Sequence, residues 1–503
     1  MCTTCTHFHK HLSCDDIIST LSTFRSSDYK SPSIWPPYSS LLSISKKAKM
    51  GKTNSSLLPL ALCCTVFLLL LLPFSLASQR SSSCNIEKLK SQKPITRLES
   101  EAGVAEIWDE SDCQFECAGV TPTRYTVQPK GLLLPRYSNY PTLIYVVEGE
   151  GILGAVIPGC PESFQSSRQG DEHQRVQKIR QGDIIALPAG ISVWGYNTGN
   201  TNLVGVAIRD IASQSNQLDR SSRMFFLAGN EPRERSSSRR SQESRRRSSD
   251  EQSRNIFSGF DTEILSEAFG VDSETARKLQ NVDQSHRGFI IKVDDFQVTM
   301  PTRVEESRRS DRSSSRSNGM EELMCNMQLV QNIDDPRRSS VIYNREAGYL
   351  SDINLNNLPI LRHINLGATR GHLRRNAVFV PHFHMNSHSV LYAIRGSARI
   401  QIVNDNGDSV HDDVVEEGEF ISVPQNFVVT MKAEENSFDF VAFKTSGIPM
   451  TSTLAGKTSI LRGIPDDVLR SSYGLSTEEV RKLKDNREEE TMLVSPGNIK
   501  STQ

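Results

Sequence analysis

Three histidines lie close together in the C-terminal half of the chain, at His382, His384 and His388. Side chains two residues apart on a β-strand point to the same side of the sheet, so His382 and His384 could bind one ion with His388 as a third ligand. A set of three imidazole groups suits zinc or copper. The alternative interpretation is that all three are surface-loop histidines without a ligand. The residues alone leave both interpretations open.

The cysteines indicate disulfide chemistry. The chain has 10 cysteines, and those beyond residue 80 are Cys84, Cys113, Cys117, Cys160 and Cys325. An oxidising compartment favours pairing of these cysteines, and their odd number leaves one free or joined to another chain. No CxxC pair occurs among them, which argues against a zinc ribbon.

An apolar run at 57–72 agrees with export into such a compartment. Met50-Gly51-Lys52 places a positive charge before it, and Ser75-Leu76-Ala77 after it provides the small residues that a signal peptidase reads. We interpret 50–77 as a secretory signal peptide, and the alternative is a transmembrane anchor. Residues 1–49 form an N-terminal extension that is not translated if Met50 is the start.

Two stretches, 231–254 and 303–318, consist largely of Ser, Arg and acidic residues. Neither can bury enough apolar surface to fold by itself. Ser/Arg runs in a nuclear protein could bind RNA electrostatically, but no RRM or KH motif accompanies them, and the formal net charge of the whole chain is -1. We therefore expect solvated insert loops and no nucleic-acid partner.

The chain repeats itself in two stretches that begin at Ile256 and Ile460. Aligned without gaps, the stretches share an Arg-Lys-Leu triplet (277–279 and 481–483) and several single residues. The chain is therefore two copies of one module, each ending in two short helices. The apolar face expected on the first helix comprises Ile264, Leu265, Ala268 and Phe269, and the pair Ser476 and Glu479 predicts a capping box. Such helices either dock on their own core or form an arm that contacts another subunit.

Upstream of each helix pair the pattern is that of β-strands. Residues 143–147 and 390–394 are apolar and precede glycines, residues 398–403 alternate, and Asn406-Gly407 favours a tight hairpin turn. Many short strands with turn residues between them predict a barrel or jelly roll.

One further motif occurs once in each copy. Residues 182–190 and 418–426 both read Gly, five residues, Pro, one residue, then Gly or Asn. This resembles the second motif of the cupin family, whose fold is a β-jelly-roll. The resemblance implies a mostly β protein of two tandem cupin barrels, each followed by a short helical arm. In catalytic cupins the first motif is HxH followed by Glu, the second motif supplies another His, and together they bind a metal.

Aligned with that pattern, copy one loses the ligand set. Its ligand positions are expected at Tyr137, Asn139, Ile144 and Val193. Copy two keeps His382 and His384, but Ser389 and Val429 stand in the other two places. We therefore expect no cofactor and no catalytic residue, with zinc or copper at His382, His384 and His388 as the alternative. The corresponding alternative function is a metal-binding cupin enzyme such as an oxidase, and a third hypothesis is a sugar- or hormone-binding cupin.

The stretch Asn318-Gly319-Met320-Glu321-Glu322-Leu323-Met324-Cys325 looks like the junction of legumin (11S) seed storage globulins, where an asparaginyl endopeptidase cuts after Asn. Asn-Gly also favours a hairpin. However, Asn318-Gly319 follows a long Ser/Arg run, whereas Asn406-Gly407 lies between alternating apolar stretches. We therefore predict cleavage at Asn318-Gly319. The segments from Cys84 and from Ile157 resemble legumins as well, and the resemblance covers about residues 84–490.

The legumin resemblance implies a non-enzymatic seed storage protein, a nutrient reservoir cut into two disulfide-linked chains. It implies an intrachain disulfide between Cys84 and Cys117 and an interchain disulfide between Cys160 and Cys325. It further implies a homotrimer that becomes a hexamer after cleavage, transit through the endoplasmic reticulum to the protein storage vacuole, and no membrane contact after signal removal. In two respects this chain departs from the family: the usual acidic N-terminal and basic C-terminal chains are reversed in tendency here, and Cys113 is an extra cysteine without an assigned partner.

These observations predict the following organisation: an extension at 1–49, a signal peptide at 50–77, a first cupin domain at 84–285 with an insert at 231–254 and an arm at 256–284, a strand region and linker at 286–318, and a second cupin domain at 319–490 with an arm at 460–485.

Overall fold

The computed structural model describes residues 84, 86–160, 164–165, 172–230, 255–280, 288–298 and 324–495. The chain divides into two compact units, Met1–Arg80 and Ser81–Gln503, and every described residue belongs to the second. The predicted extension, signal peptide, Ser/Arg-rich stretches and Asn318-Gly319 cleavage site lie outside the described residues. Within the described part, no helix is both long and apolar enough to cross a membrane.

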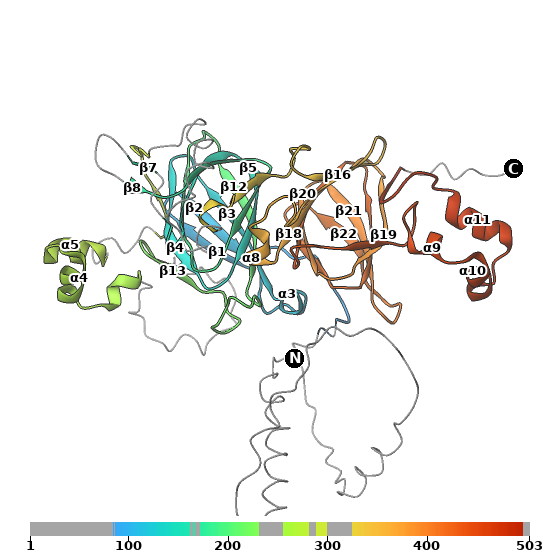
Figure 1. Ribbon diagram of the computed structural model, residues 1–503, viewed down its shortest axis with the longest axis horizontal. Helices are drawn as coiled ribbons and strands as arrows, with labels where there is room; N and C mark the ends of the chain where they lie inside the picture. Colours follow the sequence, from blue (N-terminus) through green and yellow to red (C-terminus); the bar gives the residue numbers. More distant parts are fainter. Residues whose placement is uncertain are drawn as a thin grey trace, which may run out of the picture. The chain divides into compact units, whose positions relative to one another are not determined.

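The described unit is built from two β-barrels in tandem (Figure 1), as the sequence predicts. The first barrel consists of two sheets. One has the strand order β1-β2-β3-β12-β5-β10-β15, and the other has the order β13-β4-β11-β6-β9, with β14 also paired to β4. Its elements are β1 (Thr96–Ser100), β2 (Gly103–Ile107), α3 (Cys113–Ala118), β3 (Val120–Val127), β4 (Gly131–Ser138), β5 (Thr142–Glu148), β6 (Glu150–Val156), β7 (Phe164–Gln165), β8 (Glu172–His173), β9 (Val176–Arg180), β10 (Asp183–Leu187), β11 (Ser192–Asn197), β12 (Leu203–Asp210), β13 (Met224–Phe226), β14 (Ile290–Lys292) and β15 (Val330–Asn332).

The second barrel repeats this plan strand by strand. Its sheets have the orders β16-β17-β18-β25-β20-β23 and β22-β21-β24-β19-β26, and β27 pairs with β19 as β14 pairs with β4. Its elements are β16 (Ser340–Asn344), β17 (Gly348–Ile353), α8 (Leu361–Ile364), β18 (Gly367–Leu373), β19 (Val378–His384), β20 (Ser389–Arg395), β21 (Ser397–Val403), β22 (Ser409–Glu416), β23 (Phe420–Val423), β24 (Val428–Ala433), β25 (Phe438–Lys444), β26 (Thr451–Thr453) and β27 (Leu493–Val494).

The apolar pattern of the strands explains which faces are buried. In β21 the alternating Ala398, Ile400 and Ile402 are buried, while Arg399 between them is exposed. The expected hairpin is present, because β21 pairs antiparallel with β22 and Gly407 in the turn has φ of 82°. A residue with a Cβ rarely adopts this left-handed conformation, which explains the glycine there. The strand β23, which contains Ser422 among apolar residues, is buried along its whole length although it ends the order of its sheet.

The two barrels share one hydrophobic core. Trp108 of the first half lies edge-on to Phe420 of the second, with ring centroids 4.8 Å apart. Two equivalent hydrogen bonds, each 3.2 Å long, cross the boundary in opposite directions: Arg124 donates to the Tyr392 hydroxyl, and Arg370 donates to the Tyr145 hydroxyl. The two copies of the module thus contact each other with approximate two-fold symmetry.

A reciprocal exchange of backbone pairing accompanies this contact, through an isolated bridge on one side and a strand on the other. Gln92, which precedes the first barrel, makes backbone hydrogen bonds of 2.8 and 3.0 Å with Phe420 on β23 of the second barrel. Conversely β15, which precedes the second barrel, pairs with β10 of the first, with Gln331 opposite Ile184. Each half of the chain therefore completes a sheet of the other half.

A compact helical arm lies between two strands of each barrel: β13 and β14 flank the first arm, and β26 and β27 flank the second. The first arm contains the 3-10 turn η2 (Ile256–Gly259), α4 (Thr262–Phe269) and α5 (Ser273–Leu279), and the second contains α9 (Ile460–Gly463), α10 (Asp466–Tyr473) and α11 (Thr477–Asp485). The predicted capping box of Ser476 and Glu479 is present at the start of α11. Of the apolar face expected on α4, only Leu265 is buried, at 5% exposure, whereas Ile264 and Phe269 are 60% and 55% exposed.

Candidate functional site

The interior of the second barrel holds His382 and His384, both on β19. Their rings are buried, and the ring centroids lie 5.4 Å apart. The Nδ1 atom of His382 is 2.8 Å from the Val380 carbonyl oxygen, so Nδ1 carries the proton and donates it. Burial lowers the pKa of His382 to about 3. His382 is therefore neutral, with an unprotonated Nε2 that has no hydrogen-bond partner among the described residues.

A buried lysine occupies the space beside His384. The Nζ atom of Lys444, at the end of β25, donates to Nε2 of His384 at 3.0 Å and to the Ser389 hydroxyl at 2.6 Å. Burial lowers the pKa of Lys444 to about 7, while the charge of Asp352 acts in the opposite direction. Burial, with the Lys444 charge, also holds the pKa of His384 well below its usual value. The His384 nitrogen that faces the interior is thus engaged by a cationic side chain.

The structure does not bring His388 into a common site with the other two histidines. Its Nδ1 accepts a hydrogen bond of 3.3 Å from the backbone amide of Gln425. In the described ranges, no three His, Cys, Asp or Glu side chains are arranged to hold a metal ion. A metal cation next to Lys444 would also meet electrostatic repulsion. This donor set does not fit the three-histidine zinc or copper site considered from the sequence.

We expect Lys444→Met to change how stability depends on pH. Because burial depresses the folded-state pKa, the stability that the lysine contributes is complete above its unfolded pKa near 10.5 and is lost as the pH falls toward about 7. Urea unfolding at pH 7 and pH 9.5 should show a rise on the order of a few kcal/mol in the wild type that the variant lacks. Lys432→Met, at an exposed position of β24, serves as the control and should keep the rise. An identical rise in Lys444→Met and wild type would contradict the assignment.

The strand register corrects the positions expected in the first barrel. His382 pairs with Val429, and the residue that pairs with the equivalent Val193 is Arg136. The backbone carbonyl of His384 accepts from Asn426 at 3.0 Å, just as that of Ser138 accepts from Gly190 at 2.9 Å. Arg136 and Ser138 therefore stand where the second barrel has His382 and His384, and the expectation of Tyr137 and Asn139 was wrong by one residue.

Two further equivalences follow from the register. Lys444 lies opposite Ser389, and Arg209 lies opposite Thr142. Thr142, rather than the expected Ile144, thus stands in the place of Ser389. Each barrel also carries a buried cation on the same strand position, Arg209 on β12 and Lys444 on β25. Sequence reasoning missed both cations, although each follows a run of apolar residues near the end of its strand.

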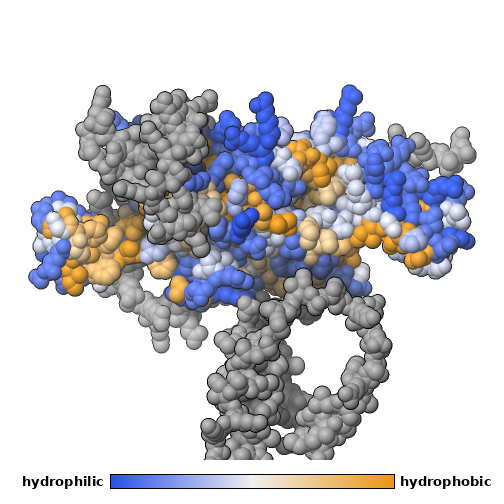
Figure 2. Space-filling view, in the orientation of Figure 1, coloured by the Kyte–Doolittle hydropathy of each residue, from blue (hydrophilic) through white to orange (hydrophobic). Residues whose placement is uncertain are grey.

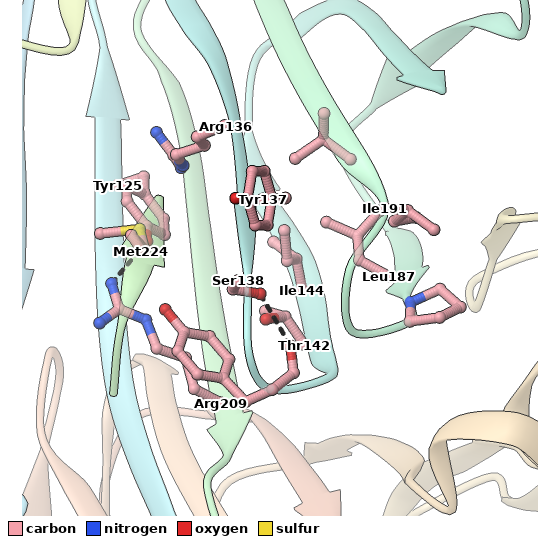
Figure 3. Close-up of a pocket in the computed structure, with 13 residues that line it drawn as sticks. Tyr125, Arg136, Tyr137, Ser138, Thr142, Ile144, Leu187, Ile191, Arg209 and Met224 are labelled. Atoms are coloured by element: carbon pink, nitrogen blue, oxygen red, sulfur yellow. Dashed lines mark hydrogen bonds between the residues drawn. The ribbon is translucent and has the colours of Figure 1, made fainter. Parts of the chain in front are cut away.

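A pocket lies at these positions in the first barrel (Figure 3). The pocket is partly open to solvent, and its lining side chains come from several strands of the barrel. The wall combines two arginines, three tyrosines and apolar residues: Tyr125, Arg136, Tyr137, Ser138, Tyr140, Thr142, Ile144, Leu187, Pro188, Ile191, Val193, Arg209 and Met224. Arg209 donates to the Ser222 hydroxyl at 2.9 Å and to the Tyr125 hydroxyl at 2.6 Å.

The cysteines form two disulfides in the structure. Cys84 is bonded to Cys117, and Cys160 is bonded to Cys325 across a separation of 165 residues. Cys113 is free and exposed.

Arg175, which was not predicted from the sequence, binds the backbone on both sides of Cys325, the partner of Cys160. Its guanidinium donates to the carbonyl oxygen of Met324 at 3.1 Å and to that of Met327. These bonds hold the segment around Cys325 against the first barrel.

A protein-family model described as Cupin matches residues 87–233 and 331–481. The 11S globulin seed storage protein Ana o 2.0101 of Anacardium occidentale is 43% identical over 436 residues, which cover 82% of this chain and 93% of that protein. The crystal structures of the coconut allergen cocosin and of pumpkin seed globulin are each 41% identical, with TM-scores of 0.73 and 0.72. Both alignments cover 82% of this chain and all of the solved chain.

Proposed function

The chain belongs to the 11S seed storage globulins, within the cupin fold, and from this membership we propose that it is a nutrient reservoir of the seed and not an enzyme. One observation in particular supports the proposal. In the second barrel, where a catalytic cupin would gather metal ligands, Lys444 contacts His384 and Ser389 instead. The first barrel has Arg136, Ser138 and Thr142 at the corresponding places. Neither set supplies the ligands that an oxidase of this family needs, so the alternative of a metal-binding enzyme has less support.

We also propose that the chain is processed at Asn318-Gly319 by an asparaginyl endopeptidase. Its two products would then be joined by the disulfide between Cys160 and Cys325. The bonds from Arg175 to the backbone of Met324 and Met327 support this arrangement, because they hold the start of the second product against the first barrel.

The helical arms support the proposal that the protein assembles through them into a homotrimer and then a hexamer. Ile264 and Phe269 in the first arm correspond to Val468 and Tyr473 in the second, and all four are exposed. In contrast, Leu265 and Leu469 are buried inside the two arms and are only 5% and 1% exposed. Figure 2 shows apolar surface over the first arm. An exposed apolar face on a compact arm favours contact with another subunit.

The proposed route is the secretory pathway. The signal peptide at 50–77 would direct the chain into the endoplasmic reticulum and, after its removal, the protein would pass without a membrane anchor to the protein storage vacuole. The two disulfides agree with an oxidising compartment. We propose the two cupin domains with the boundaries 84–285 and 319–490.

The storage role predicts how the amount of this protein changes during seed development and germination. Immunoblots of seeds should show the protein accumulating strongly during seed filling and disappearing within days of germination, because a reservoir is consumed. Blots of leaf and root serve as the control and should be blank. A low, constant level in all tissues, before and after germination, would contradict storage and favour an enzyme.

A further inference from the structure

We propose that the pocket of the first barrel binds a small organic carboxylate, whose oxygens are received by the guanidinium group of Arg136. A storage role does not require this site, and the proposal does not depend on that role. It rests on the arrangement of buried charge in the barrel, which Figure 3 shows: the ring of Tyr125 lies between the two guanidinium groups.

Both arginines are almost completely removed from water. Arg136 is 7% exposed and Arg209 is 3% exposed. The Nη1 atom of Arg136 is buried and has no hydrogen-bond partner among the described residues. No described carboxylate pairs with Arg136, and no Asp or Glu lines the pocket. A buried guanidinium keeps its charge, so an uncompensated one is costly and attracts an anion.

Aromatic rings lie beside both guanidinium groups. The guanidinium carbon of Arg136 lies 5.2 Å from the centroid of the Tyr125 ring and 5.1 Å from that of Phe289. Arg209 lies 5.9 Å from the same Tyr125 ring and 5.7 Å from Tyr140. Two like charges thus share one ring, and their mutual repulsion is relieved when an anion enters.

The walls indicate the chemistry of the rest of the ligand. Ile144, Leu187, Ile191, Val193 and Met224 are apolar and also face the pocket. A ligand with a compact apolar body and one planar anionic group matches both parts of this lining. A carboxylate can accept two parallel hydrogen bonds from a guanidinium, whereas an inorganic phosphate would place its remaining oxygens against apolar walls.

The second barrel supplies a contrast within the same chain. The equivalents of Arg136 and Arg209 are His382 and Lys444. His382 is neutral, and Lys444 is already engaged by His384 and Ser389. The second barrel therefore lacks the excess positive charge, and we expect one ligand per chain.

The test is isothermal titration calorimetry of the purified full-length protein with benzoate, benzamide and inorganic phosphate. Benzoate should bind once per chain, and benzamide, which has nearly the same shape without the charge, should bind about tenfold more weakly or worse. Arg136→Gln should weaken benzoate binding by about tenfold or more, because it removes the charged donor. Arg399→Gln removes an equal charge from an exposed strand position and is the matched control, with unchanged affinity expected.

A second variant covers the case in which Arg136→Gln does not fold. Met224→Trp fills the pocket from its edge strand without altering either arginine, and it should also abolish benzoate binding. The proposal is wrong if benzoate and benzamide bind equally, if benzoate does not bind, or if either folded variant binds it like the wild type. Displacement of benzoate by phosphate at similar concentration would also overturn it, because the site would then select charge and not a carboxylate.

Discussion

A protein with Ile264→Asp and Phe269→Asp is expected to sediment as a folded monomer, whereas the wild type is expected to sediment as the proposed trimer or hexamer. Both side chains are more than half exposed on α4, and within the arm Phe269 loses only its edge-on contact with Phe257, whose ring centroid lies 6.0 Å away, while the buried Leu265 is kept. Six buried carboxylates per trimer would lack a partner in the interface, and an isolated charge in such a place is strongly unfavourable. Analytical ultracentrifugation gives the mass, and far-UV circular dichroism checks the fold.

The choice of positions makes this experiment specific. Leu265→Asp is a poor test, because Leu265 packs inside the arm and its replacement would disrupt the helix pair whatever the arm contacts. Glu263→Ala, an exposed polar position of the same helix, is the control and should leave the assembly unchanged. If the Ile264 and Phe269 double variant still forms trimers, the arms do not hold the subunits together.

The second large effect concerns the link between cleavage and the disulfides. Mature protein should run as one band on a denaturing gel without reductant and as two bands with it, the smaller beginning at Gly319 by N-terminal sequencing. The bond between Cys160 and Cys325 is then the covalent tie between the products, because Cys84 and Cys117 both lie in the first product. In the uncut precursor the same bond closes a loop of 165 residues, which the chain-entropy model values at roughly 5 kcal/mol.

Three variants separate the parts of this prediction. Asn318→Ala should give a single band under reducing conditions, because the cleavage site is gone. Cys325→Ser should give two bands even without reductant. Cys113→Ser removes the free, exposed cysteine and should leave the wild-type pattern. Two unreduced bands in cut wild-type protein would rule out the disulfide between Cys160 and Cys325 as the tie.

Sequence reasoning was reliable where a local signal fixes a local structure. The Asn406-Gly407 hairpin and the Ser476 capping box are both present, because each depends on a few neighbouring residues. The two-barrel architecture is also confirmed, since the repeat and the motif around Gly182 and Gly418 mark equivalent points of the two modules.

Sequence reasoning was unreliable where a loop of unknown length separates two sequence motifs. The connection between β4 and β5 is one residue shorter than that between β19 and β20, so aligning by spacing moved Arg136 and Ser138 out of their places. A shift of one residue on a strand exchanges the inner and outer faces, and the charged pocket was hidden by it. In the same way, the helical pattern of α4 could not distinguish the buried Leu265 from the exposed Phe269, because both are apolar.

The backbone pairing that each barrel receives from the other half of the chain bears on whether folding or cleavage comes first. Gln92 would belong to the first cleavage product and completes the second barrel, while β15 would belong to the second product and completes the first barrel. If the chain is cut at Asn318-Gly319, each product would therefore supply backbone pairing to the other product's barrel. We expect folding to come before cutting, because the uncut chain keeps both pairings within one molecule. For the same reason, reductant alone should not release one product from the other without a denaturant.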